Sequence, residues 1–330
     1  MEARTRLARG ALTAAGCAVG IAGGWLLFDE IAAGAFGTLE VLLTLASGLL
    51  AARLAARAAR LTVVDYNVAS VAVDGPISRD GGAGVLPGSP LGAHADEVVD
   101  LVDQADEDPS VDALLVELNT PGGDVVPSDD IRLAVERFDG PVLAYATDVC
   151  ASGGYAIAVG CDEIWVRDGT IVGSIGVRLT QVNAKELADR LGVSDQTLVA
   201  GEYKDAGAAL KEFTEPEREY LQGLVDDYYD EFVEQVAERR ELGSDEVRAT
   251  EARVYLGRDA RERGLVDEVG TRDDVEDRLE ALLDEPVTVE PFHPEYSLSE
   301  RLRGGAVRVA YAFGSGLGSA VLDDETRLRL

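Results

Sequence analysis

Histidine and lysine are scarce in this chain, which has two His and three Lys among 330 residues. His94 lies in a Gly/Pro-rich stretch and His293 near the end of the last folded segment, and neither is in a catalytic motif, so a Ser-His-Asp triad is poorly supported. Three cysteines, at positions 17, 150 and 161, are too few and too dispersed for a disulfide framework or a metal site. We therefore expect no metal and no cofactor, and we expect Cys150 and Cys161 to be buried small residues.

Basic residues are also few, with 30 Lys+Arg against 61 Asp+Glu and a formal net charge of −31. The first 60 residues hold six Arg and four acids, so the remainder of the chain carries all of the negative excess. No basic patch survives there, which excludes nucleic acid as a partner. A carboxylate-rich surface stays hydrated in concentrated salt. The composition is therefore typical of proteins adapted to high salt, such as those of halophilic archaea.

The amino terminus has the composition of a membrane anchor. Residues 11–28 form an uncharged stretch of 18 residues, and residues 31–52 form a stretch of 22 residues with the single charge Glu40. About 20 apolar residues span a bilayer core, so residues 1–60 are expected to hold one or two transmembrane helices in the cell membrane. Arginines at both outer flanks and acids between the stretches favour a hairpin with both ends cytoplasmic. A single span would instead place the rest of the chain outside, and a cleaved signal sequence is the third alternative.

From about residue 61, apolar β-rich runs alternate with helical patterns, which predicts an α/β fold with a largely parallel sheet. We assign residues 61–290 to this one domain and 291–330 to an apolar C-terminal tail. A loop is expected at 80–92, where Gly and Pro are frequent. A long helix is expected at 215–241, with an apolar stripe that serves the core or subunit packing: Leu221, Leu224, Tyr228, Phe232 and Val236.

Ser152 lies in a small-residue elbow, CASGGY at 150–155, between an apolar strand at 141–146 and a short apolar helix from Tyr155. Hydrolases place a nucleophilic serine at such a strand-to-helix turn. The helix amino terminus adds free N–H groups where an oxyanion would develop. The competing interpretation is a helix N-cap, a position that serine also favours.

A second glycine turn precedes this elbow by about thirty residues. The strand at 111–118 runs directly into NTPGGD at 119–124. Two glycines after a proline let the backbone expose consecutive N–H groups, as an oxyanion hole requires, although Pro-Gly-Gly is also a common turn. The two turns together suggest acyl-transfer chemistry.

A lysine is the remaining candidate for the general base. Lys185 begins an amphipathic helix, and Lys211 has the context of a surface charge. Lys204 follows an expected strand at 196–201 in the turn-like segment GEYKDAG. A lysine that points into a cleft loses solvation, which favours the neutral amine that a base requires. The alternative is a surface pair of Lys204 with Asp205.

Several segments in order resemble the signal peptide peptidases of the SppA type (protease IV family), serine proteases of the Clp/crotonase superfamily. They are NTPGGD at 119–124, ASGGY at 151–155, GSIGV at 173–177, GEYKDAG at 201–207 and GLVDEVG at 264–270. The resemblance implies a Clp/crotonase-like fold and a Ser/Lys dyad, with Ser152 as nucleophile and Lys204 as base. It also implies oxyanion N–H groups from Gly122 and Gly153, and a hydroxyl at Ser174 that holds the lysine amine.

The resemblance implies an endopeptidase that acts on hydrophobic or membrane-derived peptides, including cleaved signal peptides. Because the sequence has no internal repeat, it is similar to single-repeat members, which form homo-oligomers that share the dyad between neighbours. Three alternatives stay open: a Clp-class membrane protease that cuts a stomatin-like partner, a crotonase-like acyl-CoA enzyme and a non-catalytic membrane scaffold.

The charge pattern generates the first testable prediction. Lowering the ionic strength from 1 M to 0.01 M lengthens the Debye length from ~3 Å to ~30 Å, so the excess carboxylates repel one another over the whole domain. Dialysis into dilute buffer should unfold the protein, and molar salt should restore its structure, as followed by circular dichroism. Full stability at low ionic strength would contradict adaptation to high salt.

Overall fold

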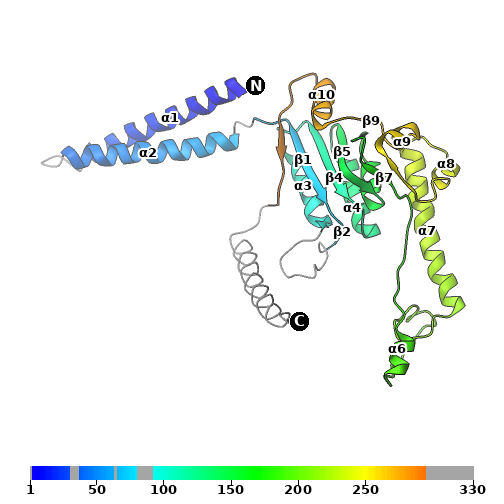
Figure 1. Cartoon of the computed structure of the whole chain (residues 1–330). Helices are drawn as coiled ribbons and strands as arrows, with labels where there is room; N and C mark the ends of the chain where they lie inside the picture. Colours follow the sequence, from blue (N-terminus) through cyan, green and yellow to red (C-terminus); the bar gives the residue numbers. More distant parts are fainter. Residues whose placement is uncertain (1, 30–36, 63–64, 80–91, 295–330) are drawn as a thin grey trace, which may run out of the picture.

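The computed structural model describes residues 2–29, 37–62, 65–79 and 92–294, and it has two parts, a helical hairpin and an α/β domain (Figure 1). Of the expected loop at 80–92 only Gly92 is described, and the predicted tail is described only as far as Pro294.

Helices α1 (Glu2–Asp29) and α2 (Gly37–Thr62) lie side by side and antiparallel, away from the domain (Figure 1). Their segments Leu7–Phe28 and Val41–Ala59 have mean hydropathies of 1.7 and 1.5 and are almost wholly exposed. Both are long and apolar enough to cross a membrane, as the sequence predicted.

Small residues hold the hairpin together. Three glycines four residues apart on α1 lie so close to α2 that a Cβ on each would meet an α2 side chain at 2.0–2.3 Å; they are Gly16, Gly20 and Gly24, facing Ala55, Ala51 and Ser47. The Ser47 hydroxyl donates to the carbonyl oxygen of Gly20 at 2.9 Å. Such close approach and interhelical hydrogen bonding are how helices associate in lipid, where apolar burial gives no drive.

The domain is built on an eight-stranded sheet. Six strands lie in the order β10–β1–β4–β5–β6–β9, and each neighbouring pair is parallel. Their bounds are β1 Val68–Asp74, β4 Ala113–Thr120, β5 Val142–Ala151, β6 Glu163–Val166, β9 Glu268–Val269 and β10 Val289–Pro291. β7 (Ile171–Gly173) pairs with the end of β5, and β8 (Val254–Leu256) is antiparallel to β7. The short strands β2 (Ile77–Ser78) and β3 (Ala93–His94) pair separately.

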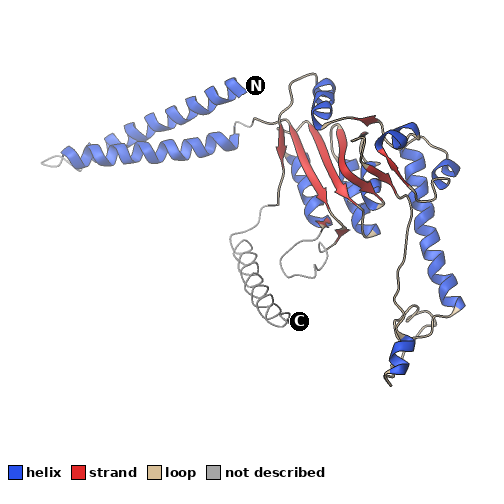
Figure 2. Ribbon diagram, in the orientation of Figure 1, coloured by secondary structure: helices blue, strands red, loops and turns tan. Residues whose placement is uncertain are grey.

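Helices cover both faces of the sheet (Figure 2). One face packs on α3 (Ala95–Glu107), α4 (Val125–Arg137), α5 (Gly153–Ala158) and the second half of α7 (Glu215–Arg239). The other face packs on α10 (Arg272–Leu283). Since both faces are buried, the strands form nearly continuous apolar runs, and the predicted α/β fold with a parallel sheet is confirmed.

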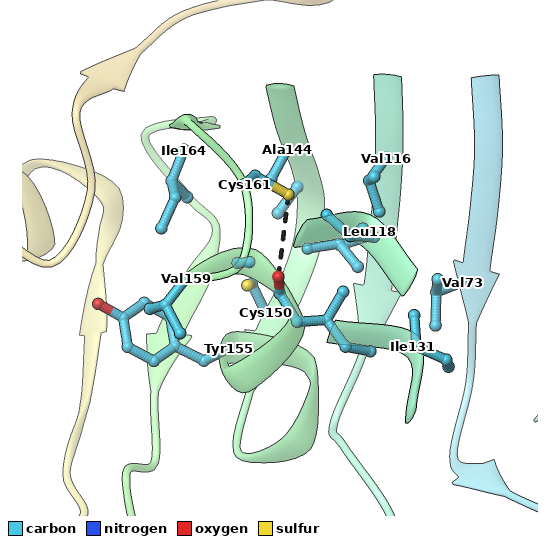
Figure 3. Packing of buried hydrophobic residues seen from close by; sticks show 14 of the residues in the cluster. Val73, Val116, Leu118, Ile131, Ala144, Cys150, Tyr155, Val159, Cys161 and Ile164 are labelled. Carbon is cyan, nitrogen blue, oxygen red and sulfur yellow. Dashed lines mark hydrogen bonds between the residues drawn. The ribbon is translucent and has the colours of Figure 1, made fainter. Parts of the chain in front are cut away.

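Cys150 and Cys161 are buried among apolar side chains, as predicted (Figure 3). Burial raises the pKa of the Cys150 thiol to about 12 and that of Cys161 well above its usual range. Both thiols therefore stay neutral at physiological pH and serve as core residues.

One sequence expectation fails beyond β7. The segment expected as a strand at 196–201 has no regular structure, because no strand lies beside it to accept its backbone hydrogen bonds, and Leu198 is 99% exposed. The stripe of α7 buries Phe232 and Val236 but leaves Leu224 and Tyr228 exposed. The first half of α7 and the preceding segment 177–214, which carries α6 (Lys185–Arg190), project from the domain (Figure 1). We call this projection the arm.

The remaining elements complete the domain after α7. They are α8 (Ser244–Arg248) and α9 (Gly257–Glu262), which precede β9, α10 and β10. β10 pairs with β1 and ends at Pro291, one residue beyond the expected boundary at 290.

The packing of the hairpin gives a prediction. Gly20→Ile should force α1 and α2 apart, because its Cβ would lie 2.3 Å from that of Ala51. Spin labels at Val19→Cys and Leu50→Cys, in a Cys17→Ser background in vesicles, should report a shift toward the ~8–10 Å axis spacing of bulkier contacts.

The matched control is Gly23→Ile on the same helix, since a Cβ at Gly23 would meet no atom within 4 Å. An unchanged distance distribution for Gly20→Ile, or equal changes for both variants, would contradict the close-packed hairpin.

Candidate active site

Ser152 occupies a strained turn between β5 and α5. Its φ and ψ are 53° and −123°, values that non-glycine residues rarely adopt. The turn is held by the Ser152 N–H, which donates to the carbonyl of Gly173 at 2.8 Å, and by the Ser152 carbonyl, which accepts from Ala156 at 2.9 Å. Ser152 occupies the N-cap position of α5, but its side chain makes no capping hydrogen bond to the helix. Such strain is typical of a nucleophile elbow that presents its hydroxyl.

The Pro-Gly-Gly turn after β4 lies directly against this elbow. Gly122 has φ of 85°, and a Cβ on it would lie 2.4 Å from the Gly153 nitrogen. A Cβ on Gly153 would lie 2.2 Å from Ser128 Oγ and 3.2 Å from the Gly123 nitrogen. Only glycine permits both approaches, which explains the small residues in the two motifs.

The N–H groups of the two turns have different partners. The N–H of Gly122 donates to Thr120 Oγ1 at 3.0 Å in a buried contact. Gly123 is exposed and lines the cleft beside Ser152. Gly153 is the first residue of α5, where a backbone N–H has no acceptor within the helix. The structure therefore favours Gly123 over the predicted Gly122 as an oxyanion donor, together with Gly153.

The elbow opens on a cleft of about 870 Å³. Ser174, predicted as a supporting hydroxyl, follows β7 with φ of 53° and lines the same cleft. One wall is the middle of α7, with Tyr228, Glu231 and Phe232. Neither His94 nor His293 is among the residues that line the cleft. Within the described part of the chain, no three His, Cys, Asp or Glu residues form a group suited to a metal ion.

Lys204 lies outside this cleft, on the arm. Its side chain is exposed and has no ion pair among the described residues. Tyr203, on one side of it, packs on Tyr220 of α7 with ring centroids 4.9 Å apart. Asp205, on the other side, pairs with Lys211 at 2.7 Å rather than with Lys204. The lysine loop is thus fixed to α7 while Lys204 itself faces solvent.

Lys211 is more than the solvated surface charge that the sequence suggested. Besides Asp205, it pairs with Glu217 at 2.5 Å, and the Glu217 side chain is only 5% exposed. Glu217 also accepts from the backbone N–H of Thr214 at 3.1 Å, within the capping box of α7. Lys211 and Thr214 hold the pKa of Glu217 below its ordinary value. No sequence pattern pointed to this Asp205–Lys211–Glu217 clamp, because Asp205 and Lys211 lie on a loop whose path to Glu217 in the first turn of α7 the sequence does not reveal.

Comparison with known proteins identifies the family of this chain. The family model of peptidase family S49 matches residues 136–285, a range that includes Ser152 and Lys204. The chain is 36% identical over 228 residues to MJ0651 of Methanocaldococcus jannaschii, which is named as a protease; the alignment covers 68% of this chain and 72% of that protein. It is 36% identical over 177 residues to a protein of Enterococcus faecium named as signal peptide peptidase SppA, covering 52% of each.

Among solved structures, a membrane-bound stomatin-specific protease superposes with a TM-score of 0.45 and 15% identity, covering 70% of this chain and 100% of that chain. The two sequence relatives are more similar to this chain, at 36% identity, and both are named as proteases. The chain therefore belongs to peptidase family S49 and is a serine protease.

Proposed function

We propose that the protein is a membrane-anchored endopeptidase that cleaves hydrophobic or membrane-derived peptides, including cleaved signal peptides, with Ser152 as nucleophile and Lys204 as base. The observation that carries this proposal is the strained backbone of Ser152, whose side chain makes no capping hydrogen bond. Ser152 lines a cleft together with Gly123 and Gly153. Family membership favours peptide hydrolysis over the acyl-CoA and scaffold alternatives. A stomatin-like protein remains the alternative substrate.

In the proposed reaction, the neutral amine of Lys204 takes the proton of the Ser152 hydroxyl as Oγ bonds to the peptide carbonyl carbon. The carbonyl oxygen becomes an oxyanion, which the N–H groups of Gly123 and Gly153 stabilise. The C–N bond then breaks, and the proton on Lys204 passes to the leaving amine. Water repeats the sequence on the acyl-enzyme, which releases the carboxylic acid product and restores both side chains.

We further propose that Lys204 serves Ser152 of a neighbouring copy in a homo-oligomer. Lys204 faces solvent at the arm, whereas the cleft of its own chain is lined without it. The arm exposes an unusual number of large apolar side chains, as an unpaired subunit interface would: Leu179, Val182, Leu187, Leu191, Leu198, Leu224 and Tyr228. Docking this surface on the next subunit would bury it and carry Lys204 to a second cleft.

The hairpin gives the proposed location. Two antiparallel spans return the chain to the side from which it started, and the arginines lie toward that end: Arg9 near the start of Leu7–Phe28, and Arg53 and Arg57 in the last part of Val41–Ala59. Arginine-rich ends of membrane spans stay in the cytoplasm. The catalytic domain is therefore proposed to lie on the cytoplasmic face of the cell membrane. The acidic composition supports a working environment of high salt.

A complementation experiment tests both the dyad and its sharing. Ser152→Ala and Lys204→Ala should each abolish cleavage of an apolar fluorogenic peptide without unfolding the protein, because nucleophile and base act as a unit. Co-expressed in equal amounts, the two variants should recover about a quarter of wild-type activity, since a ring of head-to-tail interfaces pairs an intact serine with an intact lysine at that frequency.

Arg137→Ala is the control, because Arg137 is exposed at the end of α4, away from the arm and the cleft lining, where it pairs with Asp103 of α3. It should leave activity unchanged. Substantial activity in Lys204→Ala alone would reject the dyad. No recovery at any mixing ratio would instead assign the dyad to a single chain.

The Asp205–Lys211–Glu217 clamp gives a separate prediction. Lys211→Met removes the cation between the two carboxylates, so the loop that carries Lys204 should loosen. We expect kcat to fall by about 10- to 100-fold, as misplaced catalytic groups do, and amide hydrogen exchange to quicken at 201–210. Lys211→Arg should restore both, since a guanidinium can bridge two carboxylates.

The matched control for the clamp is Lys185→Met, which breaks an ion pair elsewhere on the arm. Because the folded-state pKa of Glu217 is lowered, its contact with Lys211 stabilises the arm above the ordinary glutamate pKa of ~4.3 and is lost as acid protonates Glu217. Protection at 201–210, relative to the intrinsic exchange rate at each pH, should therefore fall in the wild type as the pH drops below ~4.3 and through the lowered pKa of Glu217. Unchanged exchange in Lys211→Met would contradict the clamp.

A further inference from the structure

Thr120 is the last residue of β4, directly before the Pro-Gly-Gly turn, and its side chain is completely buried. Its hydroxyl donates to the carbonyl of Gly75 at 2.6 Å and accepts from the N–H of Gly122 at 3.0 Å. Its methyl group packs on α5, where a Cβ on Gly154 would lie 2.5 Å from Thr120 Cγ2. One side chain thus contacts the end of β1, the glycine turn and the helix that follows Ser152.

These contacts fix the direction of the next peptide group. The carbonyl of Gly122 accepts from the N–H of Ile77 at 3.0 Å, while the Gly122 N–H is held by Thr120. In a trans peptide the C=O and the following N–H point in opposite directions. The N–H of Gly123 therefore points away from Ile77, and its nitrogen lies on the side of Gly153, 3.2 Å from where a Gly153 Cβ would be.

We propose that Thr120 is a positioning residue for catalysis: its hydroxyl holds Gly122 so that the N–H of Gly123 faces the oxyanion formed at Ser152. This inference rests on the proposed function, because it acts through acyl transfer at Ser152. The oxyanion exists only in the transition state and the tetrahedral intermediate. Loss of the hydroxyl should therefore lower kcat and leave KM nearly unchanged.

The test compares Thr120→Val, which keeps the shape but deletes the hydroxyl, with Thr120→Ser, which keeps the hydroxyl. Removing an oxyanion donor outright costs 10²–10³ in kcat, so misaiming one should cost about 10- to 100-fold. Thr120→Val should show that loss with KM within about twofold, and Thr120→Ser should stay close to wild type. Binding of a peptide boronate, which forms a tetrahedral adduct on serine, should weaken in parallel with kcat, whereas binding of an uncleaved product peptide should not.

Thr170→Val is the matched control for stability. Thr170 is also fully buried, and its hydroxyl donates to the carbonyl of Thr147 at 2.6 Å and accepts from the N–H of Arg167 at 2.9 Å. It lies outside the cleft lining. Both Val variants leave buried backbone groups unpaired and should lower the melting temperature to a similar degree, but only Thr120→Val should lower kcat. Equal losses of kcat in both would reduce Thr120 to a structural residue and overturn the proposal.

Two further measurements keep the outcomes distinct. Thr120→Cys is close to Ser in size but hydrogen-bonds weakly, so it should fold even if Thr120→Val does not; wild-type kcat in Thr120→Cys would overturn the proposal. Labelling by a fluorophosphonate should modify Ser152 of the wild type and be slowed in Thr120→Val. Equal labelling rates would reject the role of Thr120 alone, whereas a wild type that is not labelled at Ser152 would reject the proposed function together with this inference.

Discussion

The parallel pairing of β4 with β5 is the constraint on which the site depends. Leu114 lies opposite Val142 and Thr120 opposite Cys150, with a register shift between Leu118 and Thr120. Parallel neighbours end at the same edge of a sheet, so the turn after β4 and the elbow after β5 must meet although about thirty residues separate them. The sheet thereby brings the Pro-Gly-Gly turn, Ser152 and the amino terminus of α5 together without long side chains.

Sequence patterns predicted the parts of this arrangement that depend on burial and on backbone conformation within a short segment. The strands were predictable because burial on both faces requires apolar runs, and the two glycine motifs marked the places where backbone must approach backbone. The choice of Gly123 over Gly122 as the proposed oxyanion donor was not predictable. It depends on the plane of the peptide between Gly122 and Gly123, which is set by a hydrogen bond from Ile77, a residue 45 positions earlier. The strand expected at 196–201 failed for a related reason, since periodicity cannot show whether a pairing partner exists.

The arm exposes large apolar side chains to solvent in the single chain. Leu198 and Val182 are 99% and 76% exposed. The apolar residues in the first half of α7 are exposed, whereas those in its second half are buried. At ~25 cal/mol per Å² of apolar surface, such exposure is a substantial cost in water. The internal contacts of the arm nevertheless hold the segment around Lys204 in a defined form. A preformed but apolar projection is the form expected of a surface that another subunit covers.

The hairpin and the cleft lie at opposite ends of the strands. The hairpin joins the domain where β1 begins, and two consecutive residues fix that junction: Asp65 pairs with Arg9 of α1 at 2.8 Å, and the Tyr66 hydroxyl donates to Asp108 at 2.7 Å. β1 runs parallel to β4 and β5, so Ser152, which follows β5, lies at the far edge of the sheet. The 10 residues of β5 span roughly 30 Å at ~3.3 Å per residue. The residues that join the hairpin to the domain and the residues that line the cleft therefore lie at opposite edges of the sheet, separated by the length of its strands.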